Sequence, residues 1–373
     1  MQITIATFNM ENLFTRTAAM SGEPDNAKQQ AIDDEKTGNT IVRKDVYSDE
    51  DKAALLEIAE RYGMLKLNPP REALLFLQKV RGRLFATKKV GQKEHVPYVA
   101  ADGRSDWVGW FELRRSDVSW AATLNTGRVI DAHKPDILLL VEVENRPTFK
   151  RFNEQVLKAE FGWSYPYFMV IDGNDDRGID VGIASRFPIE TIRSHVTDGQ
   201  ESGGRPTFSR DCPEYDLVLP GGKRIVVLPN HFKSQRNSSK KDREEANALR
   251  LKQATRANKI AMAAKKRSDL VLVAGDLNDV PDSAPLQPIF KGFSDVMDHA
   301  DYPKDRPGTY GTGLKSGKFD YLLMSPALRK KLKTTGIERR GSYHPNIWTA
   351  FPEVTGPKNE ASDHQMVWAK FDL

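Results

Sequence analysis

The chain contains a single cysteine, Cys212, among its 373 residues. One thiol cannot form an internal disulfide, and it excludes a zinc site built from four cysteines. Long apolar runs are also missing, because no run approaches the roughly 18 apolar residues of a membrane-spanning helix. Residues 1–14 alternate like a strand and lack the charged, apolar and small-residue regions of a secretory leader. We therefore expect a cytoplasmic protein without disulfides or a membrane span.

Several enzyme motifs are absent as well. The sequence has no G-x-S-x-G elbow of a serine hydrolase, no P-loop and no glycine-rich kinase loop. Internal repeats of fixed period are also lacking. Charge of either sign is nearly balanced, with 56 Lys and Arg against 51 Asp and Glu, which leaves a net charge of +5. This small basic excess is compatible with an anionic partner but does not require one.

What the sequence does contain is an irregular order of strands and helices. Helices separate some of the expected strands, and a Pro-Gly-Gly hairpin joins others. This mixture predicts an α/β fold with two mixed sheets packed face to face and helices outside, rather than one parallel wound sheet. The expected strands include residues 3–9, 136–141, 165–171, 179–185, 215–219, 224–228, 271–274 and 318–324 and a last strand that ends at residue 371, and the expected helices are 50–62, 119–134, 149–160 and 238–267.

Residues 15–118 differ in composition from the rest of the chain. Residues 21–51 are polar and predict an exposed loop, and residues 71–80 predict an amphipathic segment after the helix at 50–62. A basic and aromatic stretch follows, and two interpretations of it stay open. It is either a nucleic-acid groove, with cations for phosphates and aromatics for bases, or a solvated surface over a small core. Its members are Arg81, Arg83, Lys88, Lys89, Lys93, Trp107, Trp110, Phe111, Arg114 and Arg115.

Polar side chains follow the apolar stretch 271–274. Gly275 ends the apolar run, and Asp276 and Asn278 come directly after it. Alternation along a strand would point both side chains the same way, although an Asp/Asn-rich turn would explain them equally well. Similar residues stand at the ends or starts of the other expected strands. They are Asn9, Glu142, His231, Asp320, Asp363 and His364.

If these side chains converge, they form a set of carboxylates, amides and imidazoles. Hard oxygen ligands suit Mg²⁺ or Mn²⁺ rather than a structural zinc ion. A His beside an Asp can orient or deprotonate a water, and amide or imidazolium groups can stabilise charge on phosphoryl oxygens. The set therefore predicts metal-assisted hydrolysis of a phosphate ester.

Seven motifs in this order resemble the endonuclease/exonuclease/phosphatase superfamily, which includes deoxyribonuclease I-like nucleases, inositol polyphosphate phosphatases and bacterial sphingomyelinases. Together they span nearly the whole chain outside residues 15–118. The resemblance implies a four-layered, deoxyribonuclease I-like α/β sandwich with the site at one edge of the two sheets. The motifs are TFNMENLF at 7–14, DILLLVEVEN at 136–145, GIDVGIASRFPI at 178–189, LPNHFKS at 228–234, VAGDLND at 273–279, FDYLLMSP at 319–326 and SDHQMVW at 362–368.

The resemblance also implies a role for each of the eight site residues. Metal binding would fall to Asn9, Glu142 and Asp363, with Glu142 as the main ligand of Mg²⁺ or Mn²⁺. Catalysis would fall to Asp276 for the attacking water, Asn278 for a phosphate oxygen, His231 for the phosphate or leaving group, and His364 for the scissile phosphate, oriented by Asp320. Val141 and Leu277 replace the Gln and Phe common in the family, and neither change removes a catalytic group.

The resemblance implies one domain over residues 1–373, with residues 15–118 as a partly helical insertion, and we expect a monomer. The basic face of residues 238–267 and the stretch 81–115 favour DNA as the substrate of an endonuclease or exonuclease. A phosphatase or phosphodiesterase for a small or lipid phosphoester is the alternative, because the same fold serves both. A catalytically silent binding module is a third hypothesis, which the intact acidic set argues against.

Overall fold

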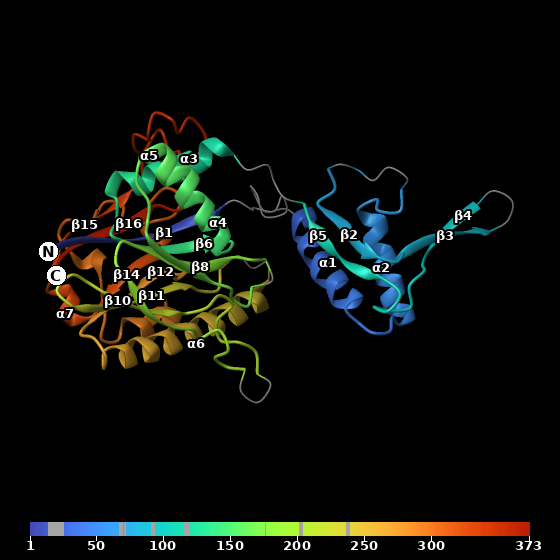
Figure 1. Cartoon of the computed structure of the whole chain (residues 1–373), viewed down its shortest axis with the longest axis horizontal. Coiled ribbons are helices and arrows are strands. Elements are labelled where there is room, and N and C mark those ends of the chain that lie inside the picture. Colours follow the sequence, from blue (N-terminus) through green and yellow to red (C-terminus); the bar gives the residue numbers. More distant parts are fainter. Residues whose placement is uncertain are drawn as a thin grey trace. The chain divides into compact units, whose positions relative to one another are not determined.

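The computed structural model describes residues 1–13, 26–66, 70, 72–90, 94–114, 119–175, 177–200, 204–235 and 239–373. The chain divides into two compact units, drawn in Figure 1. The first unit joins Met1–Phe14 to Val118–Leu373, and the second is Thr15–Asp117. We propose that the second unit is an insertion within a single domain. Among the described residues, no helix combines the length and apolar character needed to cross a bilayer.

The first unit contains two six-stranded mixed sheets. One is formed by β1 (Gln2–Leu13), β6 (Ile137–Val143), β7 (Tyr167–Ile171), β8 (Asp180–Ser185), β15 (Leu332–Glu338) and β16 (Met366–Asp372), in the order β15-β16-β1-β6-β8-β7. The other is formed by β9 (Ile189–Arg193), β10 (Glu214–Val218), β11 (Arg224–His231), β12 (Leu270–Asp276), β13 (Ser294–Asp295) and β14 (Asp320–Met324), in the order β13-β14-β12-β11-β10-β9. Each sheet has one parallel pair, β1 with β6 and β11 with β12, and its other pairs are antiparallel.

Alternation along the strands places apolar side chains on both faces of each sheet. Ile3 and Ile5 of β1 lie in the core between the sheets, together with Leu272 of β12. Ala6 and Phe8 point to the opposite face, into a second core. A fully buried side chain of this size contributes roughly 1.5–3 kcal/mol, so the sheet pairing is strongly specified.

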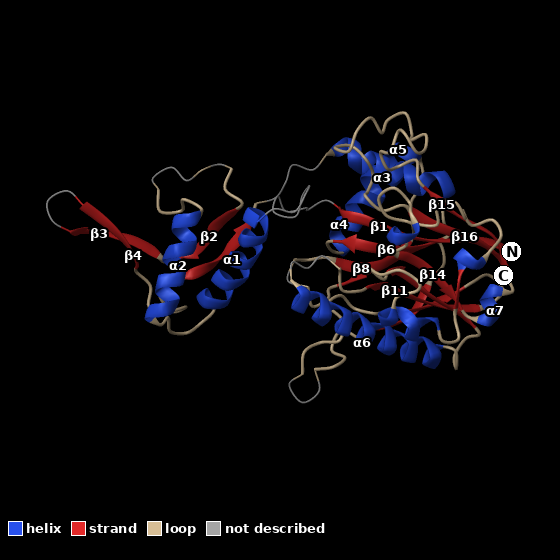
Figure 2. Cartoon of the chain, turned by 180° about the vertical axis from the view of Figure 1, so that it is seen from behind, coloured by secondary structure: helices blue, strands red, loops and turns tan. Residues whose placement is uncertain are grey.

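Helices cover the outer faces of both sheets, as Figure 2 shows. Helix α6 packs Ala257 and Ala261 against Val271 and Val273 of the second sheet. Helices α3 and α4 cover the outer side of the first sheet, through side chains such as Ile130 and Phe149. The molecule therefore has the four-layered α/β sandwich that the sequence predicts. The helices are α3 (Trp120–His133), α4 (Arg146–Phe152), α5 (Ala159–Phe161), α6 (Lys240–Ala264) and α7 (Pro326–Arg329), with a π-helical segment at Asn153–Lys158 and 3₁₀ segments at Ala284–Phe290, Val296–Asp298 and Lys315–Gly317.

Within its described residues, the second unit combines two helices with two separate strand pairs. Antiparallel β2 and β5 form one pair, and antiparallel β3 and β4 form the other. Its core contains the fully buried side chains of Leu55, Trp107 and Phe111. The elements are α1 (Asn26–Val42), α2 (Asp49–Arg61), β2 (Leu75–Arg81), β3 (Phe85–Val90), β4 (Glu94–Val99) and β5 (Val108–Leu113).

The loop expected over residues 21–51 is wrong for most of that range. Residues 21–25 lie outside the described residues, but Asn26–Val42 forms α1. The face that α1 buries includes Gly38, which lies against the ring of Phe111, and Asp34, which accepts hydrogen bonds from Arg61 and Tyr62. An apolar periodicity was invisible there because small and paired polar residues occupy the buried positions.

The amphipathic segment expected at 71–80 is a strand over most of its described part, because β2 spans Leu75–Arg81. A short apolar run such as residues 74–77 fits a helix or a strand equally well. Its pairing with β5, more than 25 residues later in the chain, decides between them.

Some aromatic residues of the basic and aromatic stretch are buried and others are exposed, which its composition did not reveal. Trp107 and Phe111 are fully buried, so neither ring can stack on a base. Trp110 is exposed. Lys93 and Arg115 lie outside the described residues.

Candidate active site

The strand ends of the two sheets meet at one edge of the first unit. Asn9 of β1 donates from Nδ2 to Oδ2 of Asp276 at 3.2 Å, which joins the first sheet to the second. Because β11 and β12 are parallel, His231 pairs directly with Asp276 at their carboxyl ends. β14 runs the other way, so its first residue, Asp320, also lies opposite Asp276. The topology thus explains why strand ends and one strand start converge.

Asp276 is buried at the centre of this cluster. Its Oδ1 accepts from the backbone N–H of Asn278 at 2.8 Å, and its Oδ2 accepts from Nδ2 of Asn278 at 3.2 Å. Asn278 does not continue the strand: its φ of 53° makes a tight turn, so the expected strand alternation is wrong although the two side chains do meet. Burial raises the pKa of Asp276 to about 7, against the opposing charge of His364.

Gly275 makes the approach to this site possible. Its φ is 127°, and a Cβ there would lie 2.0 Å from the carbonyl oxygen of Asn230 on β11. Only glycine fits such a conformation and such a close approach. At the end of β12, Gly275 is therefore required for packing, and Asp276 supplies the chemical group.

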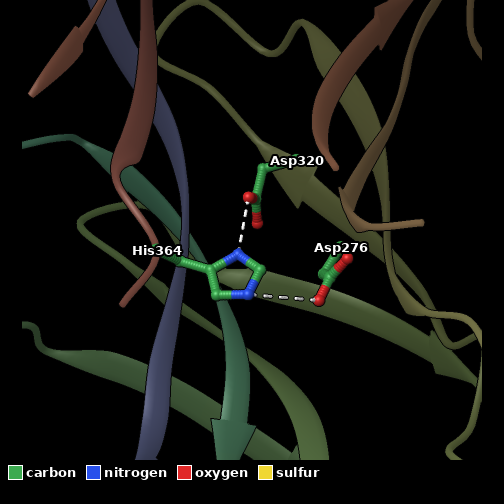
Figure 3. A group of neighbouring side chains, drawn as sticks. All are labelled: Asp276, Asp320 and His364. Carbon is green, nitrogen blue, oxygen red and sulfur yellow. Dashed lines mark hydrogen bonds and ion pairs between the residues drawn. The ribbon is translucent and has the colours of Figure 1, made fainter. Parts of the chain in front are cut away.

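Asp320, His364 and Asp276 form a relay across the site, shown in Figure 3. The Nδ1 of His364 lies 2.8 Å from Oδ2 of Asp320, and its Nε2 lies 3.8 Å from Oδ2 of Asp276. Burial opposes a charge on this imidazole, but the carboxylates of Asp320 and Asp276 outweigh it and raise the pKa of His364 well above its ordinary value. The expected partnership of Asp320 with His364 is therefore present in the structure.

His231 and Glu142 lie on the other side of Asp276. The Nε2 of His231 is 3.7 Å from Oδ2 of Asp276 and 3.8 Å from Oε1 of Glu142. Burial and the nearby charges of Arg210 and Arg177 lower the pKa of His231 well below its ordinary value. His231 is thus uncharged at neutral pH. Among the described residues, no positively charged group donates a hydrogen bond to Glu142.

Glu142 adopts an unusual backbone conformation. It has a φ of 59°, and the pairing of β6 with both neighbours shifts register at this point. Such a bulge redirects a side chain at a local cost of about 1–3 kcal/mol. Glu11 and Asn278 share this left-handed conformation at 50° and 53°, so three of the four described non-glycine residues with positive φ lie at strand ends around the site.

Asp363 lies beside the cluster. Its backbone N–H donates to Oε2 of Glu11 at 3.2 Å, and the charge of Asp363 helps to raise the pKa of the neighbouring His364. Glu11 was not among the expected site residues, although it stands in the same motif as Asn9. Glu144, the second carboxylate after β6, accepts instead from the hydroxyl of Thr148 at 3.0 Å, away from Asp276.

Two arginines near Glu142 were missed by the sequence analysis. Arg177 donates two hydrogen bonds from its guanidinium group to Asp175, at 2.8 and 2.7 Å, and Arg210 contacts the same carboxylate at 2.9 Å. Burial would raise the pKa of Asp175, but the guanidinium groups outweigh it and lower the pKa to about 2. Arg210 is 3% exposed, and its Nε has no hydrogen-bond partner. We call Arg177 and Arg210 the arginine pair; both contact the carboxylate of Asp175.

The donor set fits a divalent cation at Glu142. This carboxylate is half-buried, with 19% of its side chain exposed, and has no hydrogen bond within the described chain, so its oxygens are available to a cation. A second group, Asp276, Asp320 and His364, has ligand atoms within 4.8 Å of one another. In that group the positive charge of His364 already balances the negative charge of the carboxylates. Glu142 is therefore a better metal ligand than this group.

Residues 118–364 match the model of the Endonuclease/Exonuclease/phosphatase family. This range covers well over half of the chain and contains all the site residues except Asn9. The chain therefore belongs to this family.

Several solved structures are similar to part of this chain. Truncated TDP2 from Caenorhabditis elegans is 19% identical, with 68% of this chain and 90% of that chain covered and a TM-score of 0.46. A family protein from Bacteroides thetaiotaomicron is 13% identical, with 67% and 86% covered and a TM-score of 0.49. Another from Beutenbergia cavernae is 18% identical, with 67% and 66% covered and a TM-score of 0.46. A comparison with curated proteins gave no match.

Proposed function

We propose that this chain is a divalent-metal-dependent phosphodiesterase that hydrolyses the phosphodiester bonds of nucleic acid, with DNA as the main substrate. One observation carries the proposal. Buried Asp276 is held by two amides and has an imidazole within 4 Å on each side, at an edge where both sheets end. A fixed carboxylate between two imidazoles is suited to orienting a water for attack on phosphorus.

Each residue of the cluster has a proposed task. Asp276 accepts a proton from the attacking water, and Asn9 and Asn278 hold its carboxylate in position. His364, kept protonated by Asp320, donates a hydrogen bond to a phosphoryl oxygen as charge develops there. The uncharged His231 binds the phosphate or the departing oxygen.

Glu142 would hold Mg²⁺ or Mn²⁺, with Asn9 and Asp363 as further ligands. When bound, the ion supplies Lewis-acid stabilisation of negative charge on the phosphate. Carboxylate and amide oxygens are the ligands these ions prefer. The identity of the ion is part of the proposal.

The arginine pair supplies a second element of phosphate recognition. Two guanidinium groups share one carboxylate, so Asp175, Arg177 and Arg210 together carry an excess positive charge beside Glu142. The Arg177 side chain is 37% exposed, so it can reach a bound anion. Planar guanidinium groups bind phosphate oxygens in pairs, and we propose that Arg177 contacts the substrate phosphate while Arg210 supports it.

A phosphatase or phosphodiesterase for a small or lipid phosphoester is the second candidate, because the same cluster would serve it. A substrate screen separates the two. Plasmid DNA, single-stranded DNA, RNA, a phosphoinositide and sphingomyelin are each incubated with metal removed by EDTA and then restored. We expect cleavage of DNA that depends on Mg²⁺ or Mn²⁺. Turnover of a lipid substrate without cleavage of any nucleic acid would replace the nuclease proposal.

A further inference from the structure

Positive charge in the second unit is concentrated on one stretch of sequence. Residues 75–99 contain six Lys or Arg and one Glu, so they carry a net charge of +5, as much as the whole chain. Residues 26–66 of the same unit contain seven basic and nine acidic residues. The sheet segment is therefore basic and the helical segment slightly acidic, although the unit as a whole is close to neutral.

The five cations of this stretch that the structure describes face solvent. None of the five described cations forms an ion pair with another residue that the structure describes, whereas Lys44, Lys52 and Arg61 of the helical segment all pair with carboxylates. An ordinary solvated surface mixes both signs of charge, because like charges repel. The five exposed cations are Lys79, Arg81, Arg83, Lys88 and Lys89.

Lys88 and Lys89 lie on β3, which pairs with β4, and Arg83 lies just before β3; Lys79 and Arg81 lie at the end of β2, which pairs with β5. We call residues 79–90 and 94–99 the basic ribbon; it includes the end of β2 and the antiparallel pair β3 and β4. Leu84 and Val99 fix its inner end in the core of the unit, and the outer part of β3 is exposed. Figure 1 shows β3 and β4 projecting from the rest of this unit, away from α1 and α2.

We propose that the basic ribbon binds the phosphate backbone of nucleic acid without recognising its bases. This inference rests on the proposed function, because it names the part of the chain that binds the polymer. A two-stranded ribbon is narrow enough to enter a groove or follow a backbone. Lys and Arg contacts to phosphates give affinity and position but little sequence preference. Trp107 and Phe111 are buried and cannot stack on bases, so the exposed cations carry the proposed contact.

An anionic membrane presents the same charge, and the ribbon fits it less well. Membrane-surface elements add a cluster of large apolar side chains that enters the lipid. The exposed large apolar side chains of the ribbon are two valines and Tyr98, and Lys88 lies 5.9 Å from the centroid of the Tyr98 ring.

The test compares two double variants of the full chain. Lys88→Ser/Lys89→Ser removes two charges from the ribbon, and the control Lys330→Ser/Lys331→Ser removes two exposed charges just after α7, in the first unit. Fluorescence anisotropy measures binding to a 30-bp DNA duplex in EDTA, between 50 and 200 mM salt. Each lost phosphate contact lowers the salt slope by about 0.9, so we expect the ribbon variant to lose about two units of slope and at least about tenfold in affinity. The Lys330/Lys331 control should change little.

A second ribbon variant, Arg81→Ser/Arg83→Ser, should give the same result. Equal losses in the Lys330/Lys331 control, or unchanged binding in both ribbon variants, would overturn the inference. The inference would also be overturned if the ribbon variants lost binding to phosphatidylserine vesicles but kept their binding to the DNA duplex. Hydrolysis of bis(p-nitrophenyl) phosphate with Mn²⁺ is measured in parallel and should be the same in the wild type and all variants. Absence of this hydrolysis in the wild type would count against the proposed function, not against the ribbon.

Discussion

Glu142 and Asp320 are both carboxylates at the edge of the sheets, yet their surroundings assign them different tasks. Asp320 shares a hydrogen bond with His364, whereas Glu142 has none within the described chain. Glu142 also occupies a strained bulge, which persists only where surrounding structure enforces it. The two carboxylates can therefore be separated by their affinity for metal.

We expect Glu142→Gln to weaken Mn²⁺ binding at least tenfold, because it removes the charged ligand, and Asp320→Asn to change it less than about threefold. Isothermal titration calorimetry without substrate measures both. If instead Asp320→Asn loses the ion and Glu142→Gln keeps it, the group Asp276, Asp320 and His364 is the metal site.

Arg177 gives a second prediction at this scale. We expect Arg177→Ala to lose about 10- to 100-fold in kcat/KM, because a charge-assisted hydrogen bond to phosphate is worth about 1.5–3 kcal/mol. The control Arg186→Ala removes a similarly exposed arginine, which pairs with Asp136 at 3.5 Å, and should cost less than about twofold. Equal kcat/KM for the two variants, with both folded by circular dichroism, would remove Arg177 from the site.

The eight expected site residues could be proposed from sequence because each follows or precedes an apolar strand within a short motif. Seven of them lie in the cluster through direct contacts or distances under 4 Å, and Asp363 borders it. The arginine pair could not be proposed, because neither Arg177 nor Arg210 stands in one of the seven motifs. Only the fold brings these two arginines, 33 positions apart, onto one carboxylate.

At the scale of elements, strands were easier to predict than their irregularities. Alternating apolar residues predicted β1 and β16, and continuous apolar runs predicted β6 and β12. The bulge at Glu142 and the turn at Asn278 depend on register with neighbouring strands, which local pattern does not contain. Helix α1 was not predicted for a related reason, because its buried face carries Gly38 and a paired Asp34 in place of large apolar residues.

The contact between α3 and β15 gives a prediction about stability. Glu338 of β15 accepts from Arg340 at 2.6 Å and lies 2.9 Å from Nε2 of His133, in the last turn of α3. Burial would raise the pKa of Glu338, but these partners outweigh it and lower the pKa from 4.5 to about 2. A lowered pKa stabilises the fold above the unfolded-state value, and this stabilisation is lost as pH falls from about 4.5 towards 2.

We therefore expect Glu338→Gln to cost up to about 3 kcal/mol at pH 7 and progressively less between pH 4.5 and 2. Urea unfolding followed by tryptophan fluorescence at several pH values gives the free energy of unfolding. The control is Glu353→Gln, whose partner Arg128 lies 3.1 Å away on an open surface. A constant cost for Glu338→Gln across this pH range would show that the carboxylate is not charged in the fold.

At the scale of the whole molecule, the sandwich was predictable, but the inside of the second unit was not. Ordered motifs with a common type of strand end defined the first unit. The second unit has short elements and a core built partly on Trp107 and Phe111, and no motif guided its interpretation. Its charge distribution became informative only when the structure separated buried aromatics from exposed cations.

The central claim is that the cluster around Asp276 hydrolyses nucleic-acid phosphodiesters with the help of a divalent metal. The most direct measurement is the cleavage of plasmid DNA by the full chain with Mg²⁺ or Mn²⁺, beside Asp276→Ala and His364→Ala. We predict cleavage that EDTA abolishes and that each substitution reduces at least about 100-fold, as expected for groups that act in the transition state. A fully active His364→Ala enzyme, or a wild type that cleaves no nucleic acid with either metal, would contradict the claim.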